Sequence, residues 1–123
     1  MVAADGLIFA IPENNFSISA ALKNAYDWLS RGGAKAPVHQ KAVAFVSTGG
    51  QGGKNAQGHM RDIIKHGKLR LLEEPKVQIA RYGPGNFGED GSLISQTIID
   101  ELVPFLDAYA AFVKQPKNWY YDQ

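Results

Sequence analysis

The sequence contains no cysteine, so a disulfide, a thiolate nucleophile and a cysteine-bound metal are all excluded. It also has no apolar run near the roughly 20 residues that a membrane-spanning helix needs. Its first residues lack the basic stretch and apolar run of a secretory signal. We therefore expect a cytoplasmic protein without a membrane partner.

Neither sign of charge dominates the sequence. Thirteen lysines and arginines face 12 aspartates and glutamates, which gives a formal net charge of +1. Such a balance produces no strong field for attracting nucleic acid, and we expect no nucleic-acid partner. The length of 123 residues and the 45% of hydrophobic residues fit one domain over 1–123, with no room for a second.

Short apolar runs alternate with helical patterns along this chain. The runs at 6–11, 42–46 and 77–80 are typical of strands that are covered on both faces. Apolar residues recur at intervals of three and four over 18–29, about 55–66 and 92–114, which predicts helices there. Strands alternating with helices predict an α/β fold, in which helices flank a parallel sheet.

Two distinctive loops follow the first two predicted strands, a polar loop at 12–17 and a glycine-rich loop at 47–53. Ligands bind parallel sheets at the carboxyl ends of the strands, so we expect the two loops to lie side by side there. Each loop has a simpler interpretation, as a turn or as a flexible connection. A polar loop next to a glycine loop nevertheless favours a site for a flat ligand.

Other motifs in the sequence indicate no further chemistry. The segment 83–88 spells G-x-G-x-x-G, but the charged turn Glu89-Asp90-Gly91 follows it instead of a helix, so we reject a dinucleotide site there. The three histidines do not have the spacing of metal ligands, and no nucleophile or acid–base pair stands out. We therefore predict neither a metal site nor a catalytic side chain.

Two blocks of the sequence resemble the NADPH-dependent FMN reductase family of flavodoxin-like proteins. The segment ADGLIFAIPENN at 4–15, with ALKNAYDWLSR at 21–31, is similar to that family's A-D-G strand, its P-E-Y-N loop and its L-K-N-A-ϕ-D-W helix, where ϕ is apolar. Residues 47–61 resemble the family's G-G-x-x-G-G…A-Q…L-R block, and Asn14 stands where the family has tyrosine.

The resemblance implies a flavodoxin-like fold of three layers, α/β/α, that is truncated at its N-terminus. The family's first two strand–helix units and its phosphate-binding loop would precede Met1, which would leave the 7–11 strand as an apolar edge. It further implies an oxidoreductase that passes hydride from NAD(P)H through FMN to a quinone, free flavin, azo dye or metal oxyanion, and that forms a homodimer or homotetramer.

By the same resemblance, the loop residues would bind the cofactor. The residues expected to line the flavin ring are Pro12, Glu13, Asn14, Asn15, Ser47, Thr48, Gly49, Gly50, Gly52 and Gly53. Two alternatives stay open: a non-catalytic module for oligomerisation or for binding a full-length relative, and a chain shortened by the choice of gene start or by proteolysis.

Overall fold

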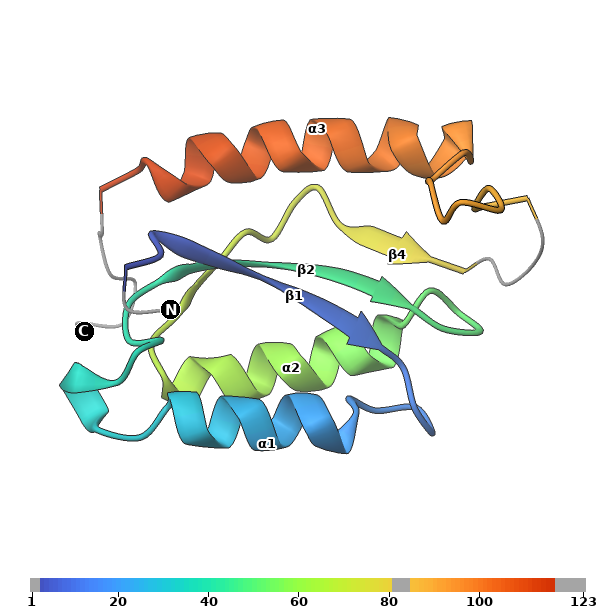
Figure 1. Ribbon diagram of the computed structural model, residues 1–123. Coiled ribbons are helices and arrows are strands. Elements are labelled where there is room, and N and C mark those ends of the chain that lie inside the picture. Colours follow the sequence, from blue (N-terminus) through green and yellow to red (C-terminus); the bar gives the residue numbers. More distant parts are fainter. Residues whose placement is uncertain (1–2, 81–84, 117–123) are drawn as a thin grey trace.

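The computed structural model describes residues 3–80 and 85–116, and these form a parallel sheet between two layers of helices (Figure 1). Helices α1 and α2 cover one face of the sheet, and α3 covers the other. The α/β prediction and its three-layer arrangement are therefore confirmed. The elements are β1 (Gly6–Pro12), α1 (Ala20–Leu29), a short 3₁₀ helix (Gly33–Lys35), β2 (Ala42–Thr48), α2 (Lys54–His66), β3 (Arg70–Leu71), β4 (Val77–Ile79) and α3 (Gln96–Val113).

Strand β2 is the centre of the described sheet. It pairs in parallel with β1 along its full length, from Gly6 opposite Ala42 to Pro12 opposite Thr48. On its other side it pairs first with β3, at Ala42–Val43, and then with β4, at Val46–Thr48. The sequence pattern predicted one strand at 77–80, and the short β3 before it was missed.

Burial on both faces explains why β2 reads as a continuous apolar run. Toward α1 and α2, Phe45 stacks on Phe9 at 6.1 Å between ring centroids, and Phe9 meets Tyr26 edge-on at 6.4 Å. Toward α3, Ala44 and Val77 pack against Phe105. Side chains that alternate along the central strand thus join both helical layers to the sheet.

Helix α3 begins at Gln96, and the prediction that it starts at Ser92 was wrong. Residues before Gln96 are held in a loop, because Gly88 N–H donates to Ser92 O at 2.8 Å and Ile94 N–H donates to Asn86 O at 2.9 Å. No described helix opens on Gly88, in agreement with the rejection of a dinucleotide motif there. None of the helices in the described ranges combines the length and hydrophobicity needed to cross a membrane.

Strand β1 forms one edge of the sheet, since within the described residues it pairs with β2 alone. Its Phe9 and Ile11 side chains are buried beneath α1 and α2. On the opposite face Ile8 keeps 42% of its surface exposed and Ala10 is also exposed. The expected apolar edge is therefore present.

The start of β1 packs tightly against α3, and this contact generates a stability prediction. A Cβ at Gly6 would overlap the Tyr109 hydroxyl and lie 3.0 Å from Val113 Cγ2. We expect Gly6→Ala to lower the free energy of unfolding by about 1–3 kcal/mol in urea titrations. The loss should shrink in a Tyr109→Phe background. Gly58→Ala is the matched control, since that helical glycine has open space above it and should gain up to about 1 kcal/mol. Equal effects of the two alanines would contradict this packing.

Candidate functional site

The two loops singled out in the sequence lie side by side at the carboxyl edge of the sheet. Glu13, the residue after the end of β1, donates its N–H to the oxygen of Thr48, the last paired residue of β2, at 2.8 Å. In Figure 1 both loops emerge from the arrowhead ends of β1 and β2. The expected juxtaposition of the polar loop and the glycine loop is therefore confirmed.

The polar loop is a tight hairpin. Asn14 and Ser17 exchange backbone hydrogen bonds of 2.9 and 3.0 Å, and the two residues between them have left-handed backbones, with φ of 48° at Asn15 and 62° at Phe16. Such paired positive φ angles occur in two-residue hairpin turns, where asparagine is well tolerated. Pro12, Asn14 and Asn15 are exposed, so the polar groups of this loop are accessible from solvent.

Glu13 differs from its neighbours in the loop, because its carboxylate accepts a hydrogen bond from within the protein. Its Oε2 accepts a hydrogen bond of 3.0 Å from the Ala56 N–H, in the first turn of α2. The N-cap of that helix is Gly53, which has no side chain to offer as an acceptor. Glu13 therefore caps a helix that begins 41 residues after it in the sequence (54 − 13).

The glycine loop is shaped from inside by the buried Ser47. Its Oγ donates to Gly52 O at 2.5 Å and accepts from Gln57 Nε2 at 2.9 Å, while Gln57 Nε2 also donates to Val77 O at 2.9 Å. Thr48 Oγ1 donates to Ile79 O at 3.0 Å. These bonds fix the loop to α2 and β4, so its geometry is built before any ligand arrives.

Glycine is required at several loop positions for close approach. Gly52 and Gly53 have φ of 72° and 75°, and a Cβ would lie 2.8 Å from Gln78 O in the first case and 2.7 Å from Ser47 Cβ in the second. At Gly49 a Cβ would lie 2.8 Å from Glu13 Cβ, so this glycine admits the capping side chain. These three glycines therefore serve the loop's own structure.

Gly50 stands apart from the other loop glycines. A Cβ built there meets nothing within 4 Å, and its φ lies outside the left-handed region. Among the described residues, the N–H groups of Gly50 and Gln51 have no hydrogen-bond acceptor. An open glycine beside two free donors is suited to a flat ligand whose ring edge carries oxygen and nitrogen acceptors.

The predicted site residues thus fall into two groups by position. One group is exposed at the edge of the sheet and consists of Pro12, Asn14, Asn15 and Gly50. The other group holds the loops in place and consists of Glu13, Ser47, Thr48, Gly49, Gly52 and Gly53. Sequence reasoning assigned no role to Gln57, which anchors Ser47, nor to His59, whose Nδ1 lies 2.9 Å from Ser17 Oγ. The A-Q pair of the second block was the available signal for Gln57. No group of metal-binding side chains occurs in the ranges that the structure describes.

Removal of the Glu13 carboxylate should loosen the junction between the loops. We expect Glu13→Ala to lower the free energy of unfolding by about 1 kcal/mol, as the loss of an N-cap does, and Glu13→Gln to lower it less, because an amide oxygen still accepts. Urea denaturation followed by circular dichroism measures both values. Glu101→Ala, on the exposed side of α3, is the control for loss of a carboxylate. An Ala variant as stable as wild type would show that the cap contributes nothing.

Comparison with known proteins places this geometry in a family. The model of the NADPH-dependent FMN reductase family matches residues 1–83. A probable NADPH:quinone oxidoreductase 2 from Oryza sativa subsp. japonica is 40% identical over 115 residues, covering 89% of this chain and 54% of the relative. A 2-hydroxy-1,4-benzoquinone reductase from Burkholderia sp is 33% identical over 113 residues, covering 90% of this chain and 61% of the relative.

A solved structure agrees with these sequence matches. FerB, a flavoenzyme NAD(P)H:(acceptor) oxidoreductase from Paracoccus denitrificans, superimposes with a TM-score of 0.81 at 23% identity, over 92% of this chain and 63% of its own. That likeness shows the flavodoxin-like fold. The chain spans 54% and 61% of the length of the two curated relatives above. Since the family model matches well over half of its residues, the chain belongs to the NADPH-dependent FMN reductase family.

Proposed function

We propose that this protein is a flavin-dependent oxidoreductase, in which hydride from NAD(P)H passes through FMN to a small acceptor such as a quinone. The main support for this proposal is the pair of adjoining loops at the carboxyl edge of the sheet, where the N–H groups of Gly50 and Gln51 are free to donate. The printed names of the relatives, which include quinone reductases, support the same reaction class.

The residues present fit the ring end of a flavin. The Gly50 and Gln51 amides are free to donate to its polar atoms, and Asn14 and Asn15 add side-chain donors and acceptors on the neighbouring loop. Glu13, Ser47 and Gln57 hold both loops at fixed separation. Bound FMN supplies the atom that accepts and releases hydride, so the chain needs to position and shield the ring and to supply no acid or base of its own.

The experiment that tests this proposal is an assay with the protein saturated in FMN. Oxidation of NADPH or NADH should rise when 1,4-benzoquinone is added, above the rate of the same FMN and quinone without protein. The second candidate function, a non-catalytic module for association, is favoured by the exposed edge of β1. A rate no higher than that without protein would support the module and contradict the enzyme.

The isolated 123-residue chain should bind FMN weakly and without preference for its phosphate. Residues 12–17 and 48–53 contain no lysine or arginine, and Glu13 adds negative charge. Each missing charge-assisted hydrogen bond to the phosphate weakens binding by about 1.5–3 kcal/mol. We therefore expect a Kd for FMN that is well above the micromolar range. Fluorescence titrations should give FMN and riboflavin Kd values within about threefold of each other. Submicromolar FMN binding by a monomer would contradict this expectation.

Gly50→Val should reduce flavin affinity by a steric clash with the bound ring, without changing the stability of the free protein. The space above Gly50 is empty, so valine fits the free protein, but its methyl groups occupy the path of the ring. We expect a loss of about tenfold or more in riboflavin affinity with an unchanged free energy of unfolding. Gln51→Ala is the control, because it keeps the backbone N–H and should change affinity less than threefold. Unchanged affinity in Gly50→Val would remove this loop from the site.

We further propose that residues 1–123 form one domain unit and that it assembles as a homodimer or homotetramer. Ile8 on the β1 edge is 42% exposed, and Trp28 on α1 is 74% exposed, so each can be covered by a second copy. Light scattering should detect a dimer or larger species that Ile8→Lys or Trp28→Glu disrupts. A well-folded species at 13.4 kDa would be evidence against assembly. Cytoplasmic location stays a sequence-based prediction.

A further inference from the structure

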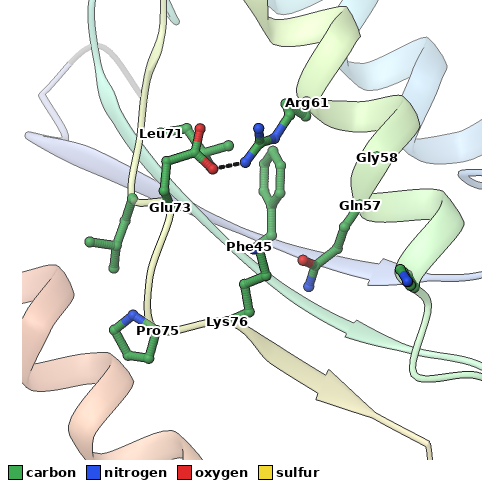
Figure 2. Close-up of a pocket in the computed structure, with 10 residues that line it drawn as sticks. Phe45, Gln57, Gly58, Arg61, Leu71, Glu73, Pro75 and Lys76 are labelled. Atoms are coloured by element: carbon green, nitrogen blue, oxygen red, sulfur yellow. Dashed lines mark ion pairs between the residues drawn. The ribbon is translucent and has the colours of Figure 1, made fainter.

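A pocket lies between α2 and the segment that joins β3 to β4, and its lining is separate from the proposed flavin loops. Figure 2 shows Gln57, Gly58 and Arg61 of α2 on one side and Leu71, Glu73 and Pro75 on the other. Its volume is about 270 Å³, and its lining is Phe45, Lys54, Gln57, Gly58, Arg61, Leu71, Leu72, Glu73, Pro75 and Lys76. None of the proposed flavin-site residues belongs to this lining.

The pocket arises from an interruption in the sheet. Strand β3 pairs with Ala42–Val43 of β2, and β4 resumes the pairing only at Val46. The residues between β3 and β4 pass this gap without pairing to β2, and the buried Phe45 lies in the stretch of β2 that neither strand pairs with. On the facing helix, Gly58 leaves open space where any other residue would place a side chain. Glycine is unfavourable inside a helix, and no described contact requires it at this position.

The lining carries an excess of positive charge. Lys54, Arg61 and Lys76 contribute cations, whereas Glu73 is the one carboxylate among the lining residues. Arg61 forms an ion pair with Glu73, and Lys76 bonds Glu74 at 2.6 Å, outside the lining. The side-chain ammonium group of Lys54 has no hydrogen bond or ion pair within the described residues. Exposed ion pairs such as these are weak and exchange readily for another anion.

The pocket's apolar surfaces complement this charge. Phe45, Leu71, Leu72 and Pro75 line it together with the cations, so a ligand with a flat apolar body and a negative group would complement both. A volume of about 270 Å³ lies just below the roughly 300–1,000 Å³ of typical ligand pockets, which suits a single ring and is too small for a dinucleotide.

We propose that this pocket binds a small planar aromatic anion, of the size and charge of benzoate. The carboxylate is held by Lys54 with Arg61 and Lys76, and the ring packs on the apolar wall. The occupant lies against Gln57, whose side-chain amide also holds Ser47 beneath the glycine loop. The proposal does not depend on the flavin function, and its test needs no flavin.

The test is a titration of the flavin-free chain with benzoate, followed by amide NMR shifts. Benzoate should shift the amides of α2 around Gly58 and of residues 71–76. Benzamide, which lacks the charge, and acetate, which lacks the ring, should each bind at least about tenfold more weakly. Benzamide binding as tightly as benzoate, or no saturable shift with benzoate at millimolar concentration, would overturn the proposal.

Two variants and a control locate the site. Gly58→Leu fills the open space on α2 and should abolish the benzoate shifts, while circular dichroism reports a folded helix. Lys54→Met should weaken benzoate about tenfold. Lys65→Met is the matched control, since Lys65 lies on the same helix outside the lining and bonds Asp62 at 2.7 Å. Equal benzoate affinity in wild type and in both pocket variants would contradict the assignment.

Discussion

The arrangement of the candidate site depends on the hydrogen bonds made by Glu13. Its N–H continues the β1–β2 ladder to Thr48, and its carboxylate accepts from the first turn of α2. One residue thus joins the polar loop, the end of β2 and the helix that follows the glycine loop. A carboxylate at a helix N-terminus satisfies a donor that the helix itself cannot, and it also suits the helix dipole. The separation of the two loops is therefore set by the protein's own bonding.

The second constraint is on the glycine loop, which packs closely against the protein on its inner side and is open to solvent on its outer side. Because Gly49, Gly52 and Gly53 have no side chain, the neighbouring residues Glu13, Gln78 and Ser47, respectively, can lie close to them. Gly50 faces empty space. A loop that is rigid on its inner side and bare on its outer side loses little entropy when it binds a flat ring. This division explains why substitutions at neighbouring glycines should have different consequences, on folding in one case and on ligand affinity in the other.

Much of the fold could be predicted from sequence because β2, at the centre of the sheet, is buried on both faces, whereas β1 is an edge strand that keeps Ile8 and Ala10 exposed on one face. The runs at 6–11 and 42–46 have no polar alternation, and this indicates a parallel sheet whose carboxyl edge places both loops together. The break between β3 and β4 was missed, since two- and three-residue strands leave almost no periodic signal. The start of α3 was misplaced because the bonds of residues 88–94 to their own loop are invisible in a hydrophobic pattern. Glu13 was expected to face the flavin, and its capping contact, 43 residues away in sequence, is one that local pattern does not encode.

We propose that the two loops at the carboxyl edge of β1 and β2 hold the flavin ring. Amide NMR spectra of the chain, recorded during titration with riboflavin, test it most directly. The account predicts that the largest shifts occur at Gly50 and Gln51, with smaller shifts at Asn14 and Asn15, and that the amides around the pocket between α2 and residues 71–76 move little. Shifts concentrated at that pocket or along the β1 edge, with Gly50 and Gln51 unmoved, would contradict the account.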